Sequence, residues 1–116
     1  PGPLFPWKRL ADEGLIAWPD TAMVAAKRPL YEFQLPDAKW FQDKLADFGY
    51  NTSRSGEWDV LTQDSLISFQ MRYRPQKYDG RPDAEIAALL DVATTEHGMV
   101  LSKPVVGTRQ PYTARW

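Results

Sequence analysis

The chain has 116 residues, of which 43% are hydrophobic and 25% are charged, and its formal net charge is −1. This length is enough for one domain with its own core, and no apolar run approaches the ~20 residues of a transmembrane helix. A charge so close to neutral argues against a nucleic-acid partner, which would need a basic face. With no cysteine and with His97 as its one histidine, the chain lacks the usual ligands of a zinc site. We therefore expect neither a cofactor nor a catalytic set within these residues.

One short helix is predicted within residues 1–20. Pro6 suits the first turn because the N–H that proline lacks would be unpaired there, and Gly14 can supply a left-handed stop. Trp7 and Leu10 give the helix an apolar edge. This edge predicts that the helix either packs on the main domain as a satellite or belongs to the end of a preceding domain.

Residues 21–35 are predicted to be a linker. They lack a sustained hydrophobic period, and Pro29 disfavours helical backbone in the residue before it. We expect the linker to be ordered only where Leu30, Tyr31 and Phe33 find a surface on which to pack.

A helix with clear boundaries is predicted from residue 37 to residue 48. Asp37 can accept hydrogen bonds from the unpaired N–H groups of the first turn. Phe41, Leu45 and Phe48 follow at i, i+4 and i+7, which places them on one face, and Gly49 favours a stop.

Two further helices follow with the same start signal. Asp59 is the predicted cap of the second helix, which must end before Pro75, and Asp83 is the predicted cap of the third. Each helix carries one apolar face. In the second helix the face comprises Thr62, Leu66, Phe69 and Tyr73, and in the third it comprises Ile86, Leu90 and Ala93. We interpret the three aspartates as caps rather than as catalytic carboxylates.

A short unit is repeated along these helices. Phe41-Gln42 and Phe69-Gln70 share a dipeptide, while Gly56-x-x-Asp59 and Gly80-x-x-Asp83 place a glycine three residues before a cap. Three short helices with one apolar face each can bury those faces only by packing together. The chain is therefore predicted to be an all-α protein built on a small three-helix bundle.

Residues 96–116 are predicted to form an extended tail, because Pro104, Gly107 and Pro111 interrupt its apolar residues. A short strand within the tail is one alternative, and disorder is the other. The terminal Trp116 predicts docking on a partner or on a neighbouring domain.

The longest motifs lie around the repeat. They are Trp40-Phe41-Gln42-x-x-Leu45-x-x-Phe48-Gly49-Tyr50, Gly56-x-Trp58-Asp59-x-x-Thr62 and Asp79-Gly80-x-x-Asp83. Together they resemble the three-helix peptidoglycan-binding domain of bacterial cell-wall hydrolases, over about residues 36–93. Phe69-Gln70-Met71-Arg72-Tyr73-Arg74-Pro75 with Tyr78-Asp79-Gly80 is similar to one subgroup, the C-terminal domain of AmpD/AmiD-type N-acetylmuramoyl-L-alanine amidases.

This resemblance implies a domain organisation. Residues 1–20 would be the C-terminal end of a zinc amidase domain, residues 21–35 a linker, residues 36–95 the peptidoglycan-binding domain and residues 96–116 the tail. In the family, a Lys-x-Asp-Pro-Gly motif supplies a zinc-ligating aspartate and a catalytic lysine, and this chain starts at the Pro-Gly. Zinc and the catalytic residues are therefore expected in the upstream amidase domain, and none is carried over to this chain.

The resemblance also implies a function and a location. The expected function is to bind peptidoglycan and to target or position the catalytic domain, which cleaves the amide between N-acetylmuramic acid and L-alanine. The expected partners are peptidoglycan and the upstream amidase domain, in the bacterial cell envelope, either in the periplasm, with or without a lipoprotein anchor, or secreted. The alternative is a non-catalytic interaction module that docks on its own catalytic domain or on another protein through Trp7, Trp18 or Trp116.

A face that binds peptidoglycan needs flat aromatic rings for sugars and amide or guanidinium donors for carbonyls and carboxylates. The predicted binding residues lie around two loops and are Tyr50, Trp58, Gln70, Arg72, Tyr73, Arg74, Tyr78 and Arg81. Several have a structural alternative: Trp58 could fill the core, Tyr73 continues an apolar face, and Gln70 could bond a loop carbonyl. The arginines could form a solvated basic rim that attracts an acidic polymer.

Overall fold

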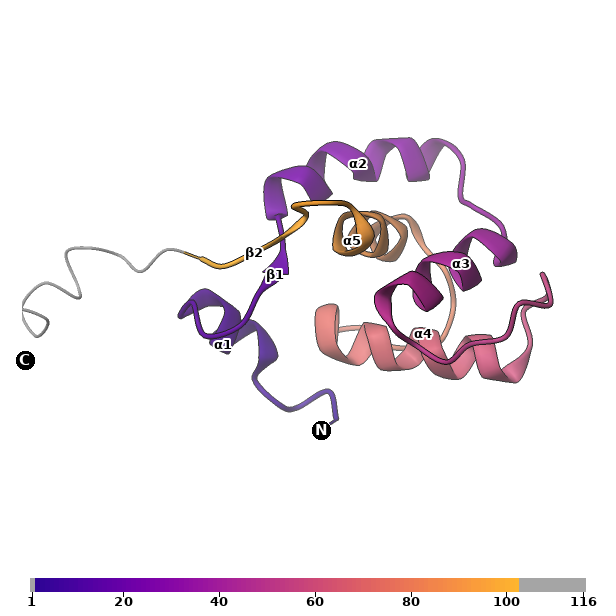
Figure 1. Cartoon of the computed structure of the whole chain (residues 1–116), viewed down its shortest axis with the longest axis horizontal. Helices are drawn as coiled ribbons and strands as arrows, with labels where there is room; N and C mark the ends of the chain where they lie inside the picture. The colour runs from indigo at the N-terminus through magenta and orange to yellow at the C-terminus, as the bar shows by residue number, and fades with distance from the viewer. Residues whose placement is uncertain (1, 103–116) are drawn as a thin grey trace, which may run out of the picture.

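The computed structural model describes residues 2–102 and has a bundle of three helices at its centre (Figure 1). These helices are α3 (Ala38–Phe48), α4 (Val60–Tyr73) and α5 (Ala84–Thr94). The predicted apolar faces meet in one core, whose fully buried large side chains include Phe41, Leu45, Leu66, Phe69, Ile86 and Leu90. The prediction of a small all-α bundle is confirmed.

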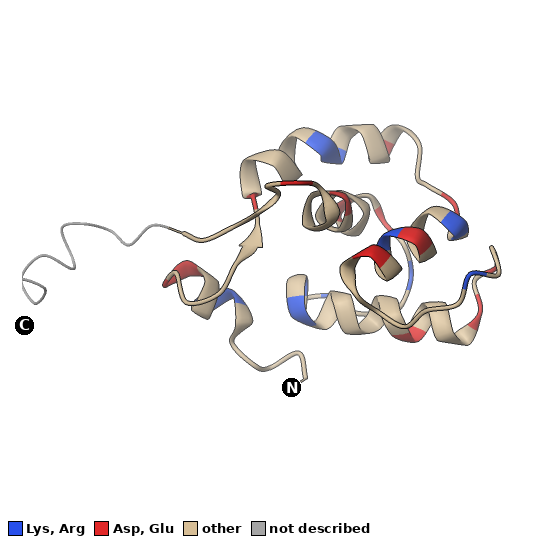
Figure 2. Ribbon diagram, in the orientation of Figure 1, with Lys and Arg blue, Asp and Glu red and all other residues tan. Residues whose placement is uncertain are grey.

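All three helices begin at the predicted aspartate. Asp37, Asp59 and Asp83 each accept a hydrogen bond from the backbone N–H three residues later, at 3.0, 3.0 and 2.9 Å. Because these N–H groups have no partner within the helix, the carboxylates satisfy donors that would otherwise need water. Charged residues of both signs are spread over the helices (Figure 2). The interpretation of the three aspartates as caps is confirmed.

The segment predicted to be a linker is a helix instead. Helix α2 (Thr21–Phe33) continues through Pro29 and lies along α5 (Figure 1). The Tyr31 hydroxyl donates a hydrogen bond to the carboxylate of Asp91, and Lys27 Nζ lies 3.5 Å from the same carboxylate. This packing on α5 outweighs the helical hydrogen bond that proline removes. The prediction was wrong because it considered the local sequence without the surface that the segment covers.

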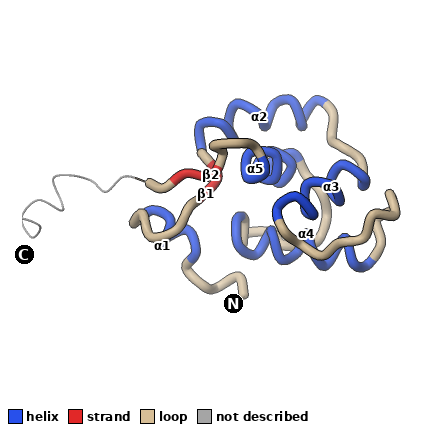
Figure 3. Tube along the Cα trace, in the orientation of Figure 1, coloured by secondary structure: helices blue, strands red, loops and turns tan. Residues whose placement is uncertain are grey.

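The N-terminal segment is attached to the bundle by a helix and a two-stranded sheet. Helix α1 (Trp7–Asp12) lies against α4. Strand β1 (Trp18–Pro19) pairs in antiparallel fashion with β2 (Met99–Val100), and the two are drawn in red in Figure 3. Trp18 is buried, with its ring centroid 4.8 Å from that of Tyr73. Helix α1 therefore packs on the main domain, and this contact does not decide whether it also ends a preceding domain.

The structure confirms a short strand in the predicted tail, at β2. The remainder of that tail, with Trp116, lies outside the described residues. Within residues 2–102, none of the helices has the length and apolar character needed to cross a membrane. The boundaries of the predicted domains, and the assignment of residues 1–20 to the end of a catalytic domain, stay predictions.

Candidate functional site

The Phe-Gln repeat of the sequence is also a structural repeat. In both copies the glutamine amide oxygen accepts a hydrogen bond from the N–H of the loop glycine, at 2.8 Å for Gln42 with Gly56 and at 2.8 Å for Gln70 with Gly80. In both copies the amide nitrogen donates to the carbonyl of the residue after that glycine, at 2.9 and 3.0 Å. Each helix thus holds the loop that leads to the next helix. We call these two arrangements the glutamine clamps.

The clamp at the second loop requires glycine. Gly80 has a φ of +73°, in the left-handed region that side chains disfavour. A Cβ at this position would also lie 3.0 Å from Cγ1 of Ile67 on α4. The loop therefore approaches α4 closely, and its path to the cap at Asp83 is set by the backbone of Gly80 and the amide of Gln70.

Three of the predicted binding residues are used within the fold. Gln70 is fully buried, and its predicted alternative role, bonding a loop carbonyl, is the one the structure shows. Tyr73 is buried in the core. Arg74, whose side chain is only 11% exposed, forms ion pairs of 2.8 Å with Asp83 and of 2.8 Å with Glu85. Gln70 and Arg74 hold the second loop from inside, while Tyr73 and Arg74 also line the groove described below.

Tyr50 and Arg72 lie close together at one end of the bundle. The Tyr50 ring is stacked on Phe48, with 5.8 Å between the centroids, and burial together with the proximity of Tyr73 raises the pKa of the Tyr50 hydroxyl. The Arg72 guanidinium, which lowers that pKa by its charge, lies 4.2 Å from the centroid of the Trp7 ring. Trp7 was absent from the predicted site because the sequence alone does not show that α1 meets α4.

The remaining predicted residues differ in exposure. Trp58 is half-buried, with its ring centroid 5.5 Å from that of Phe41, so it plugs the bundle beside the start of α4. Tyr78 and Arg81 are exposed on the second loop. Tyr78 lines a hollow of about 510 Å³ with Pro75 and the N-terminal arm.

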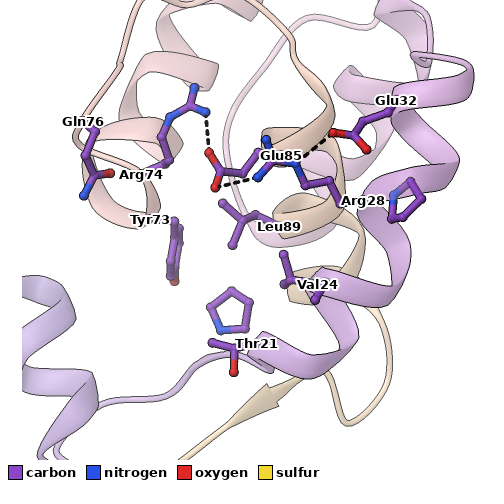
Figure 4. A pocket seen from close by; sticks show the side chains of 12 residues that line it. Thr21, Val24, Arg28, Glu32, Tyr73, Arg74, Gln76, Glu85 and Leu89 are labelled. Atoms are coloured by element: carbon purple, nitrogen blue, oxygen red, sulfur yellow. Dashed lines mark hydrogen bonds and ion pairs between the residues drawn. The ribbon is translucent and has the colours of Figure 1, made fainter.

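A groove of about 440 Å³ lies between α2, α5 and the end of α4 (Figure 4). Its apolar lining includes Val24 and Leu89. Along one wall, Glu85 connects the two sides of the groove, because its carboxylate lies 2.8 Å from Arg74 Nη1 and 3.4 Å from Arg28 Nη1. Such a combination of apolar lining and paired charges suits a ligand with both ring faces and amide or carboxylate groups. The sequence did not indicate this groove, because its α2 wall was predicted to be a linker.

The acidic side chains of the groove lie in ion pairs. Within residues 2–102 there is no group of three or more His, Asp and Glu side chains that could hold a metal ion. The acidic residues of the groove, Glu85 and Glu32, are each paired with Arg28, at 3.4 and 3.3 Å.

The comparisons with known families agree with the motifs of the repeat. Residues 34–90 match a family model described as "Putative peptidoglycan binding domain". Over 105 residues the chain is 33% identical to N-acetylmuramoyl-L-alanine amidase AmiD of Escherichia coli (strain K12). This alignment covers 84% of this chain and 36% of that protein. The chain thus spans about a third of the length of this relative.

Solved structures give the same result for the fold. AmpDh3 from Pseudomonas aeruginosa superposes with a TM-score of 0.72 and 36% identity, over 84% of this chain and 38% of that one. AmiD from E. coli, solved with the substrate anhydro-N-acetylmuramic acid-L-Ala-D-gamma-Glu-L-Lys, superposes with a TM-score of 0.71 and 32% identity, again over 84% of this chain and 38% of that one. The similarity therefore extends beyond the residues that match the family model.

Proposed function

Because residues 34–90 belong to the peptidoglycan-binding domain family, we propose that this chain binds the cell wall on behalf of a bacterial N-acetylmuramoyl-L-alanine amidase. The observation that carries this proposal is the similarity to AmiD over 105 residues, which is longer than the family domain and so includes flanking segments. The parent would cleave the amide between N-acetylmuramic acid and L-alanine. The chain would act in the cell envelope, in the periplasm or outside the cell.

The mechanism that we propose for this chain is positioning. Weak binding to a repetitive polymer raises the local concentration of a linked active site near its substrate. Because α1 and β1 are packed on the bundle, a catalytic domain joined to the N-terminal arm would also be restrained in orientation. Zinc and the catalytic residues would lie in that upstream domain, and no step of the hydrolysis is derived from this chain.

We place the candidate ligand contacts in the groove between α2 and α5. Its arginine and glutamate side chains can bond amides and carboxylates, and its apolar lining can receive ring faces or methyl groups. Arg28 is the best probe, since its side chain is 48% exposed and its ion pairs with Glu32 and Glu85 contribute little to stability at the surface.

Co-sedimentation with insoluble peptidoglycan sacculi tests the proposal. We expect the 116-residue chain to sediment with sacculi at low salt. We expect Arg28→Ala to raise the dissociation constant by about three- to tenfold, because a hydrogen bond to a charged group is lost. Arg54→Ala is the matched control, because Arg54 is also an exposed arginine with a carboxylate partner, Asp43 at 3.5 Å, but lies on the first loop away from the groove. A chain that stays in the supernatant at every sacculus concentration would overturn the proposed function.

A second candidate function is docking on the upstream catalytic domain. Trp18 is buried in this chain and Trp7 is half-buried against Arg72, so neither offers the free surface expected of a docking residue. The observation that favours docking is instead the exposure of Leu30 and Phe33 on α2, at 61% and 90%. Capture of the separate upstream domain by this chain without cell wall, and loss of capture in Phe33→Ala, would support this alternative. Equal capture by both chains would count against that surface.

A further inference from the structure

The groove between α2, α5 and the end of α4 is bordered by residues 19–89. Among the described residues, neither the N-terminal arm nor α1 contributes to its lining. Its α2 wall, which includes Val24 and Arg28, lies outside the residues 34–90 that match the family model. The groove is therefore a surface that the bundle forms together with α2, apart from the arm at which the proposed function joins the catalytic domain.

The apolar lining of the groove is aliphatic. Val24 comes from α2 and Leu89 from α5 (Figure 4). Tyr73 is the one aromatic residue among the described residues of the lining, and it is only 6% exposed. The rings of Trp18 and Phe69 each lie 4.8 Å from its centroid. The groove thus lacks an open aromatic face for a sugar ring, whereas its aliphatic lining suits methyl groups.

Two polar side chains of the lining have unused hydrogen-bonding groups. Arg28 reaches Glu32 at 3.3 Å and Glu85 at 3.4 Å, which is longer than the about 2.7–2.9 Å usual for charge-assisted hydrogen bonds. Its Nη2 has no partner among the described residues. The amide of Gln76, an exposed residue that follows α4, likewise has no partner there. Both side chains are available to a ligand.

The charges of the groove have both signs. The Arg28 side chain is 48% exposed and that of Glu32 is 55% exposed, and such a surface ion pair contributes at most about 1 kcal/mol, so that a ligand can replace it. The stem peptide of peptidoglycan also carries both signs, since it has carboxylates and a diamino acid with an ammonium group. It further has backbone amides and alanine methyl groups. The glycan strand offers mainly rings and hydroxyls, for which the groove is less suited.

We propose that the groove binds the stem peptide of peptidoglycan, with a carboxylate of the peptide at Arg28 and its alanine methyl groups between Val24 and Leu89. The Gln76 amide bonds the peptide backbone. The inference rests on the proposed function and deepens it, because it identifies the part of the polymer that is recognised. It also gives α2 a role in recognition, in addition to its packing on α5.

Competition for sacculi tests which part of the polymer is bound. The probes are the tripeptide L-Ala-γ-D-Glu-L-Lys, which has no sugar, and tetra-N-acetylchitotetraose, which has no peptide. We expect an excess of the tripeptide to reduce the fraction of the 116-residue chain that sediments with sacculi. An equal excess of the oligosaccharide should leave that fraction unchanged. Arg28→Ala should raise the dissociation constant of the tripeptide, measured by calorimetry, by about three- to tenfold.

A pair of leucine variants on α2 tests whether the groove is the site. Ala25 is exposed and lines the groove, whereas the adjacent Ala26 is equally exposed and does not. Because alanine and leucine are both good helix formers, each variant should keep the thermal unfolding midpoint of the unmodified chain. Ala25→Leu fills the groove and should raise the dissociation constant of the tripeptide by at least about threefold. Ala26→Leu should bind as the unmodified chain does.

The outcomes separate this inference from the proposed function. Sedimentation with sacculi that the tripeptide does not reduce would overturn the stem-peptide assignment and leave the proposed function intact. Displacement by the oligosaccharide alone would do the same in favour of the glycan strand. Tripeptide binding that is equal in Ala25→Leu and Ala26→Leu would overturn the groove as the site. Failure of the unmodified chain to sediment with sacculi would overturn the proposed function itself.

Discussion

At the scale of single residues, the most prominent side chains of the repeat hold the fold. Gln70 was predicted to contact a ligand, yet both Gln70 and its counterpart Gln42 have their amides committed to a glycine-containing loop. Burying an amide without partners would cost about 1–3 kcal/mol, so its hydrogen bonds to the loop are what make its burial tolerable. The residues that we predict or propose to contact the ligand, such as Tyr78 and Arg28, are instead exposed.

Asp59 makes stability depend on pH in a definite direction. Hydrogen bonds from the hydroxyls of Ser53, Thr62 and Ser55 and from the Thr62 backbone N–H hold the pKa of this carboxyl well below its ordinary value. As pH falls below about 4, the unfolded carboxyl takes up a proton while the folded one stays ionised, so acid favours unfolding. This contribution is fully present above that pH and is lost on acidification.

We therefore expect the free energy of unfolding of the unmodified chain to fall more steeply than that of Asp59→Asn between about pH 5 and about pH 2. Urea unfolding at each pH, followed by circular dichroism, measures both curves. Ser53→Ala, which removes the donor with the largest effect on this pKa, should give an intermediate slope. Parallel curves for all three proteins would contradict the role of Asp59.

At the scale of elements, α2 shows how packing overrides a local signal. A proline inside a helix costs about 3 kcal/mol, and Pro29 was reason enough to predict a linker. The contact with α5 reverses that outcome, because Val24 and Tyr31 pack against the core and the Tyr31 hydroxyl bonds a largely buried carboxylate, that of Asp91. The groove exists only because this segment is helical and lies beside α5.

Tyr31→Phe tests the attachment of α2. The change removes the hydroxyl that donates to Asp91 and leaves the carboxylate with Thr95 Oγ1 at 3.0 Å and Lys27 at 3.5 Å. Because a hydrogen bond to a charged group is lost, we expect the free energy of unfolding to fall by about 1.5–3 kcal/mol. Tyr78→Phe is the matched control and should change it by less than about 0.5 kcal/mol, as an exposed loop position does. Equal stability of the two variants would show that α2 does not depend on this contact.

At the scale of the whole molecule, the segments that flank the family domain are part of one folded unit. Trp18 packs on Tyr73 in the core, and β1 pairs with β2, so residues from both ends of the described chain meet beside α1. This arrangement favours positioning over loose tethering, because a domain attached through a packed helix and a strand has fewer orientations than one on a flexible linker.

The candidate site was predicted in part. The roles of Tyr50, Arg72 and Tyr78 in binding stay predictions, whereas Gln70, Tyr73 and Arg74 have their side chains engaged within the fold. The distinction depends on burial, which the residue type does not reveal: an arginine with two acidic partners and one beside a tryptophan ring have the same letter in the sequence. Arg28 was not predicted, and Trp7 was predicted only as a docking residue, because their neighbours in the structure are distant in sequence.

The sequence by itself determined the three helices of the bundle, their aspartate caps and the repeated glycine loops, because these features depend on contacts between residues close along the chain. The helical spacing of the apolar residues and the capping geometry are local properties. Only the tertiary structure decided that α2 is a helix, that β1 pairs with β2, and that the N-terminal arm meets α4. Those features arise from contacts across more than 50 residues, such as that between Tyr31 and Asp91, whose separation along the chain is 60.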